Sequence, residues 1–281
     1  MKVDLNGKIA VVTGGGGVLC AEIAHALSKS GAKVAVLDLN ADAAEKVAAA
    51  IRADGGIAIG VAANVLDLES LKAAESTVRA EFGICDILIN GAGGNSPKGT
   101  TSKEYLEQSD LADVSPELKT FFDLDPAGIS FVFNLNFIGT LLPTQVFAHG
   151  MAERGKGAVL NISSMNAFTP LTKIPAYSAA KAAVSNFTRW LSVHFAKVNI
   201  KVNAIAPGFF LTEQNRALLN NPDGTLTARG DAIIRRTPMG RFGKPSDLCG
   251  AVLFLLDEDA SAFINGVVLP VDGAFSAFSG V

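Results

Sequence analysis

Residues 9–20, IAVVTGGGGVLC, join four aliphatic residues to a threonine, four consecutive glycines and the start of a helical segment. A strand buried on both faces of a parallel sheet is continuously apolar, as Ile9–Val12 is. Glycines in the turn let a ligand approach the backbone, and the next helix, expected from Leu19 to Ser30, offers free N–H groups at its start. The stretch predicts the first β–turn–α unit of a dinucleotide-binding sheet.

The same alternation of apolar strands and helical segments continues along the chain. Strands are also expected at 33–37, 57–62, 87–90, 158–162, 201–206 and 267–271, and helices at 41–54, 68–82, 131–150, 176–196 and 246–256. This order is typical of an α/β fold with a doubly wound parallel sheet and helices on both faces. Because no linker or internal repeat interrupts it, we expect residues 1–281 to form a single Rossmann-type domain.

Two segments interrupt this rhythm, at 91–125 and 209–237. Both follow the ends of predicted strands, at the sheet edge where open α/β folds hold their ligands. Loops of this length are commonly lids or binding loops, although a surface insertion is the alternative. We expect them to border the ligand crevice.

The composition argues against several other classes of protein. The net charge is −3 and basic residues are scattered, so no nucleic-acid footprint or anionic-membrane patch is expected. No apolar stretch reaches the roughly 18–20 residues of a spanning helix, and the N-terminus lacks the long apolar stretch of a signal peptide. Three widely spaced cysteines favour a reducing compartment, and the three histidines lack metal-ligand spacing. These features predict a cytoplasmic protein without a metal site.

Asp38 supports the assignment of the glycine turn to a cofactor. It closes the second predicted strand, 24 residues after Gly14. A carboxylate at this place accepts hydrogen bonds from the adenosine ribose hydroxyls and repels a 2′-phosphate. No Lys or Arg lies beside it in the sequence, so NAD is favoured over NADP.

Tyr177 and Lys181 are four residues apart on a predicted helix and therefore share a face. An ammonium group near a phenol lowers its pKa, and such a phenol exchanges a proton with an alcohol or a ketone. Ser164 ends the preceding strand, where its hydroxyl could hold the reacting carbonyl oxygen. Capping of a turn or helix is the alternative role for this serine.

In this order the motifs resemble the short-chain dehydrogenase/reductase family, over nearly the whole chain from Lys8 to Gly273. The resemblance rests on the glycine turn, Asp38, Asn64-Val65, Asn90-Gly-Ala-Gly93, Asn136, Ser164, Tyr177-Ser-Ala-Ala-Lys181, Pro207-Gly208 with Thr212, and Val271-Asp-Gly273.

The resemblance implies roles for the catalytic residues. Ser164 would position the carbonyl group and Tyr177 would be the acid/base. Lys181 would hold the nicotinamide ribose and tune Tyr177, and Asn136 would complete a proton relay through water to Lys181. A homotetramer is also implied, and the apolar tail at 274–281 would lie at a subunit interface.

It further implies where the cofactor binds. Asn64 and Val65 would flank the adenine, and Thr212 would bind the nicotinamide amide. The full set of implied cofactor contacts is Gly14, Gly17, Val18, Leu19, Asp38, Asn64, Val65, Asn90, Ala92, Gly93, Tyr177, Lys181, Pro207, Gly208 and Thr212.

Three positions depart from the family pattern. Val18 and Cys20 stand where the family has glycine, and Gly91 stands where it has asparagine. A β-branched residue tolerates a positive φ poorly, so the unusual dihedral angles are expected within Gly14–Gly17. The change at Gly91 looks harmless from the sequence.

Stretches such as INGAGGNSPK (89–98) and SSMNAFTPLTK (163–173) are most similar to family members that act on sugar acids. A sugar acid needs a cation for its carboxylate and polar groups for its hydroxyls. If TEQNRALL begins a helix, Arg216 shares a face with Thr212 and is the first candidate cation, ahead of Lys173 and then Lys98. Candidate polar contacts are Asn95, Asn166 and Gln214.

Other functions stay open at this point. The substrate could be another polyol or sugar acid, such as gluconate, and Phe168, Phe209 and Phe210 keep a more apolar substrate in view. A dinucleotide-binding protein without catalysis is a third reading. The presence of Ser164, Tyr177 and Lys181 together argues against it.

Overall fold

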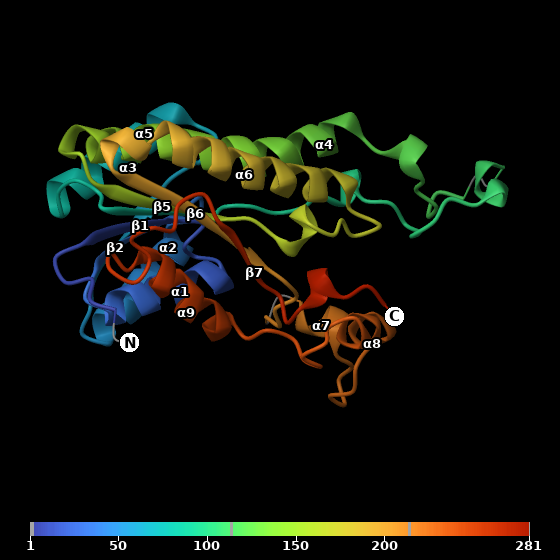
Figure 1. The fold of residues 1–281 in the computed structure, drawn as a ribbon. Helices are drawn as coiled ribbons and strands as arrows, with labels where there is room; N and C mark the ends of the chain where they lie inside the picture. The colour runs from blue at the N-terminus through green and yellow to red at the C-terminus, as the bar shows by residue number, and fades with distance from the viewer. Residues whose placement is uncertain (1–2, 113–114, 213–214, 281) are drawn as a thin grey trace.

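A seven-stranded sheet forms the centre of the molecule in the computed structural model, which describes residues 3–112, 115–212 and 215–280 (Figure 1). Its strand order is β3-β2-β1-β4-β5-β6-β7, and every neighbouring pair is parallel. The strands are β1 (Ile9–Thr13), β2 (Lys33–Asp38), β3 (Ile57–Ala62), β4 (Ile87–Asn90), β5 (Gly157–Ile162), β6 (Ile200–Pro207) and β7 (Val268–Val271).

Helices cover both faces of the sheet, as the doubly wound prediction requires. One face carries α1 (Val18–Lys29), α2 (Ala41–Ala53) and α9 (Cys249–Leu256), and the other carries α3 (Leu68–Glu81), α5 (Gly139–Arg154) and α6 (Pro175–His194) (Figure 1). The shorter α4 (Pro126–Phe133), α7 (Arg216–Leu219) and α8 (Ala228–Arg235) lie toward the carboxyl ends of the strands.

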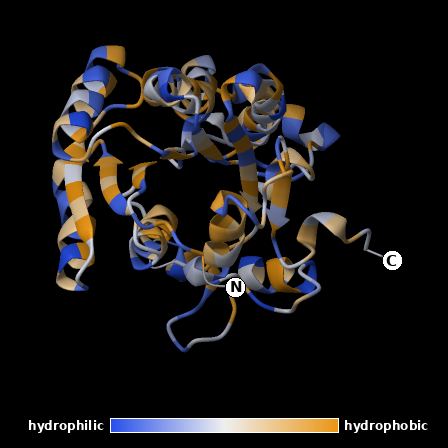
Figure 2. Cartoon of the chain, turned by 60° about the vertical axis from the view of Figure 1, so that its left-hand side comes forward, coloured by the Kyte–Doolittle hydropathy of each residue, from blue (hydrophilic) through white to orange (hydrophobic). Residues whose placement is uncertain are grey.

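Continuous apolar strands explain this layering. Successive side chains of a strand point to opposite faces, so Ala10 and Val12 of β1 pack with α1 and α9, while Ile9 and Val11 pack with α3 and α5. The central strands are correspondingly hydrophobic in Figure 2. All seven predicted strands are present, and their predicted bounds are within one residue of the observed ones.

The helix expected at 131–150 differs from the prediction. It runs from Pro126 to Arg154 as α4, a π-helical turn at Asn134–Ile138, and α5. By length and composition alone this continuous helix could cross a membrane, contrary to our expectation from the sequence. Its Phe147 and Met151 are buried against the sheet, so it is a core helix.

Residues 95–112 and 115–125, hereafter the arm, project from the carboxyl edge of the sheet beyond the rest of the molecule (Figure 1). Backbone bonds fix the root of the arm: Thr101 N–H donates to Lys173 O over 3.0 Å, and Asp125 N–H donates to Lys98 O over 3.2 Å. The other long segment, 209–237, was predicted to be a loop. It contains α8, which the sequence analysis missed, as well as α7.

Candidate active site

The glycine turn brings β1, α1 and the loop after β4 into close contact. Of its four glycines only Gly14 has a positive φ, +63°. The unusual dihedral angle expected within Gly14–Gly17 is therefore confined to one residue. A Cβ on Gly14 would lie 2.8 Å from Ala92 Cα, so a side chain has no room there. The N-cap of α1 is Gly17, which has no side-chain cap, and the first N–H groups of the helix are therefore suited to an anion.

Asp38 lies beside this turn, at the end of β2. Its Oδ2 accepts from Gly16 N–H and its Oδ1 from Asn40 N–H, both over 3.0 Å. These bonds hold the carboxylate in place, and each carboxylate oxygen keeps a further lone pair. The group is therefore built to accept hydroxyl donors next to the glycine turn.

Ser164 and Tyr177 form the centre of the candidate catalytic group. Ser164 follows β5 and caps a 3₁₀ turn at Met165–Ala167, its Oγ accepting from Asn166 N–H over 3.2 Å. The capping role and the substrate-facing role are thus compatible. Burial raises the pKa of Tyr177, and the hydrogen bond with the Ser164 side chain partly opposes this rise. The phenol is therefore protonated at neutral pH and can act as a proton donor.

Lys181 follows one helical turn later on α6 and is only 4% exposed. Its Nζ donates to Ile162 O over 2.8 Å and lies 5.7 Å from the centre of the Tyr177 ring. Burial lowers the pKa of Lys181 to about 8. The sequence predicts that this ammonium group lowers the pKa of Tyr177, whereas burial of the phenol raises that pKa.

Asn136 lies within the π-helical turn, a feature often found at functional sites. Its Nδ2 donates to Gly94 O over 2.7 Å and to Val132 O over 2.8 Å. A Cβ built on Gly93 would lie 2.7 Å from Asn136 Oδ1 and 3.2 Å from Lys181 Nζ. The fold therefore brings Asn136 and Lys181 to the same residue, as the proposed relay needs.

Beneath the candidate catalytic residues lies a ladder of hydrogen-bonded, buried polar side chains that the sequence does not predict. Asn90 Nδ2 donates to Thr144 Oγ1 and to Asn161 Oδ1, each over 2.9 Å, and Asn161 Nδ2 donates to Thr188 Oγ1 over 2.9 Å. Helical bonds continue it through Thr140 to the carbonyl oxygen of Asn136. The Asn90 side chain thus lies in the interior, and its contact with a cofactor stays a prediction.

The remaining cofactor candidates lie near the carboxyl ends of β3 and β6. Asn64 is exposed, and the buried Val65 packs against the start of α5. Pro207 ends β6, and Gly208 N–H donates to Val271 O over 3.0 Å. Thr212 N–H donates to Asn215 Oδ1 over 2.8 Å, which fixes the loop after β6.

The substrate candidates are divided between two regions. Lys98 and Asn95 belong to the arm, whose root is joined to Lys173 just before α6. Lys98 Nζ lies 3.6 Å from Asp125 Oδ2, so its charge already has a partner. Asn95 Nδ2 donates to Thr100 Oγ1 over 3.1 Å, and Asn166 is buried at 5% exposure.

Arg216 and Thr212 do not share a helical face, and the prediction that paired them is wrong. α7 begins at Arg216, so Thr212 precedes the helix and shares no helical face with it. Gln214 lies outside the described residues. Phe209 and Phe210 line a cavity of about 270 Å³ with Met239 and Val271, beside this loop.

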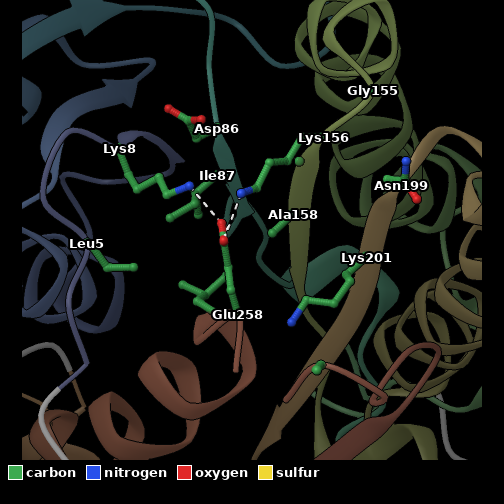
Figure 3. Close-up of a pocket in the computed structure, with 13 residues that line it drawn as sticks. Leu5, Lys8, Asp86, Ile87, Gly155, Lys156, Ala158, Asn199, Lys201 and Glu258 are labelled. Carbon is green, nitrogen blue, oxygen red and sulfur yellow. Dashed lines mark hydrogen bonds and ion pairs between the residues drawn. The ribbon is translucent and has the colours of Figure 1, made fainter. Parts of the chain in front are cut away.

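Another cavity, of about 360 Å³, lies at the opposite edge of the sheet, near the amino ends of β1, β4, β5 and β6 (Figure 3). Lys8 and Lys156 both bind Glu258 there, over 2.6 and 2.7 Å. Lys201 Nζ donates to Ser261 Oγ over 2.8 Å. These lysines have partners within the chain, and the cavity lies at the amino ends of the strands, whereas Tyr177 lies near their carboxyl ends. It is therefore separate from the candidate active site.

Comparisons with known proteins agree with this geometry. The family model described as short chain dehydrogenase matches residues 8–223. An uncharacterized oxidoreductase of Bacillus subtilis, UxuB, is 50% identical over 99% of this chain and 98% of its own length.

Two solved structures are also similar. A Haemophilus influenzae protein, provisionally named a D-mannonate oxidoreductase and solved with bound NAD, is 56% identical with a TM-score of 0.93, covering 99% of this chain and 98% of that one. A gluconate 5-dehydrogenase from Burkholderia cenocepacia, in complex with NADP and tartrate, is 29% identical with a TM-score of 0.83, covering 99% and 98%. The chain is therefore an NAD(P)-dependent oxidoreductase of the short-chain dehydrogenase/reductase family.

Proposed function

We propose that this protein interconverts D-fructuronate and D-mannonate with NAD(H). The observation that carries the proposal is the 56% identity to the provisionally named D-mannonate oxidoreductase, over nearly the full length of both chains. We also propose that residues 1–281 act as one catalytic domain in the cytoplasm and assemble as a homotetramer.

The residues around the glycine turn fit NAD. The close approach at Gly14 and the uncapped start of α1 suit a pyrophosphate group. The fixed carboxylate of Asp38 suits the two ribose hydroxyls and disfavours a 2′-phosphate. The bound NAD of the Haemophilus influenzae protein supports this choice.

In ketone reduction the cofactor supplies a hydride, and the chain supplies the proton. Tyr177 donates its phenolic proton to the carbonyl oxygen as that oxygen gains negative charge. The Ser164 hydroxyl, hydrogen-bonded to Tyr177, holds the same oxygen in line. In the oxidative direction Tyr177 takes the proton from the alcohol.

Lys181 and Asn136 support this proton transfer. The Lys181 ammonium group, with its pKa near 8, is mostly charged at pH 7 and favours the phenolate that forms when Tyr177 gives up its proton. The side chain of Asn136 is held by hydrogen bonds to Gly94 and Val132. It lies beside Gly93, as Lys181 does, and can order a water that returns a proton to Lys181.

Lys173 is the cation that we propose for the substrate carboxylate. It lies four residues before Tyr177, beside the root of the arm, and takes part in no ion pair with a residue that the structure describes. Lys98, by contrast, is already near Asp125. Arg216 is the alternative, on the loop after β6.

The test is a substrate panel with purified protein, NADH or NADPH, and D-fructuronate, other keto sugar acids and neutral ketoses. We expect loss of NADH absorbance to be fastest with D-fructuronate. Tyr177→Phe is the matched control, because it keeps the ring and removes the proton donor. Faster turnover of another acid would replace the proposed substrate, and no turnover of any ketone by folded protein would favour a dinucleotide-binding protein.

A dehydrogenase for a different sugar acid is the second candidate. The similarity to a gluconate 5-dehydrogenase, whose structure also holds the dicarboxylate tartrate, supports it. The same panel separates the two candidates, since a gluconate dehydrogenase would oxidise D-gluconate faster than D-mannonate.

A further inference from the structure

Residues Gly91, Ala92 and Gly93, hereafter the spacer loop, are in close contact on both sides. On the cofactor side, a Cβ on Gly14 would lie 2.8 Å from Ala92 Cα, and a Cβ on Gly91 would lie 2.2 Å from Cys20 Sγ. On the catalytic side, a Cβ on Gly93 would lie 2.7 Å from Asn136 Oδ1 and 3.2 Å from Lys181 Nζ. The spacer loop therefore sets the distance between the glycine turn and the proton-transfer residues.

Cys20 fills the space that a side chain at position 91 would need. It is the third residue of α1, is 6% exposed and packs in the core shared with α2 and α9. Burial raises its pKa to about 12, so the thiol stays neutral at physiological pH. Its contribution at this place is therefore volume rather than charge or nucleophilicity.

The spacer loop has little freedom to move away from Cys20. Thr13 Oγ1 accepts from Gly91 N–H over 3.1 Å and from Ala92 N–H over 3.3 Å. An added side chain at position 91 must displace the sulfur or break these bonds. Reaching an ordinary carbon–sulfur contact from 2.2 Å needs a shift of about 1.5 Å.

We infer that Cys20 is a positioning residue, whose sulfur rests against Gly91 and sets the place of the spacer loop, and with it the place of Asn136 and Lys181. This links two departures from the family pattern that looked unrelated in the sequence. The larger residue at position 20 is matched by the smaller one at position 91. The inference rests on the proposed function for its turnover assay, but not for its binding assay.

The test is a double-mutant cycle at positions 20 and 91. Gly91→Ala places its Cβ against the sulfur, and we expect a fall in kcat of roughly 10²-fold, the loss typical of a 1 Å misplacement. In Cys20→Ala/Gly91→Ala the two Cβ atoms would be 3.6 Å apart, an ordinary contact. We expect the double variant to recover to within about tenfold of the wild type, since a 2.9 Å approach to Thr13 O remains.

Two further measurements separate positioning from general damage. NADH affinity, followed by fluorescence, should weaken in Gly91→Ala and recover in the double variant, whatever the substrate is. The pH dependence of kcat should shift and return in the same order, because Lys181 is displaced and then restored. Gly250→Ala, in open space on α9, and Cys85→Ala, a buried cysteine away from the site, are the matched controls and should leave activity unchanged.

The outcomes are distinct. A double variant no better than Gly91→Ala in turnover and NADH affinity overturns the inference. If Gly91→Ala does not fold, the double variant decides, since its recovery of folding and turnover supports the coupling and its failure overturns it. A wild type that binds NADH but turns over no sugar acid overturns the proposed function alone, because the coupling in NADH affinity is still measured.

Discussion

Lys181→Met should remove the destabilisation of the folded protein that comes from burying an ammonium group. Burial lowers the pKa of Lys181 from 10.5 to about 8, so at pH 7 the charged side chain destabilises the folded state by about 3 kcal/mol. Methionine has a similar length and no charge. Its disadvantage is that Ile162 O loses the hydrogen bond from Nζ, which costs about 1–3 kcal/mol and depends little on pH.

The pH dependence isolates the charge from the hydrogen bond. Between pH 8 and 10.5 the unfolded wild type binds more protons at this lysine than the folded protein does, so wild-type stability rises with pH in this window. The methionine variant lacks this rise. The free energy of unfolding of the variant minus that of the wild type should therefore fall by about 2 kcal/mol between pH 7 and pH 9.5.

The assay is urea-induced unfolding of both proteins at the two pH values, at one protein concentration and ionic strength. Lys173→Met is the control, because it makes the same change at a lysine that is more exposed than Lys181. A difference for Lys181→Met that stays constant between pH 7 and pH 9.5 would refute the reasoning. The variant should also lose turnover, which would show that this buried charge serves catalysis at the expense of stability.

Four other predictions follow from the site. Tyr177→Phe should lower turnover by roughly 10²–10⁴-fold with little change in NADH affinity, and near-normal turnover would remove this residue from the mechanism. Asp38→Ala should weaken NADH binding and narrow the gap to NADPH, so a wild type that already prefers NADPH widely contradicts its role. Lys173→Gln should raise KM for a sugar acid more than for a neutral ketose, and Arg216→Gln is measured with the same two substrates for comparison. Equal effects of Lys173→Gln on both substrates would assign Lys173 a structural role. Light scattering should give a tetramer mass, and a monomer at working concentration would contradict the proposed assembly.

The strands were predictable because burial on both faces leaves a continuous apolar signal. Ile9–Thr13, Ile57–Ala62 and Ile87–Asn90 have the predicted bounds. The π-helical turn at Asn134–Ile138 was not predictable, because its residues fit an ordinary helical pattern. The missed α8 is short and polar, and its signal is weak beside Pro222 and Gly224.

At the site, the sequence pattern identified the residue types but not their bonding. It did not indicate that the Asn90 side chain joins a buried ladder with Asn161. It treated Gly91 as a harmless change, because the contact with Cys20 joins positions 71 residues apart and leaves no local signal. It also expected Lys181 to lower the pKa of Tyr177, which depends on burial that spacing does not reveal.

The tail also shows what a sequence pattern leaves open. Phe275 is 8% exposed and packs edge-on against Phe209, so part of the apolar tail is covered by its own chain. Phe278 stays 45% exposed and is the part for which a subunit contact remains a prediction.

The way the arm is attached has a consequence for how this enzyme could be re-engineered. The two bonds at its root, Thr101 N–H to Lys173 O and Asp125 N–H to Lys98 O, join main-chain atoms, which every non-proline residue provides. We therefore expect the sheet to tolerate replacement of the arm by the corresponding segment of a homologue. In such chimeras we expect the stability of the fold to resemble that of the recipient protein and the substrate preference to resemble that of the donor.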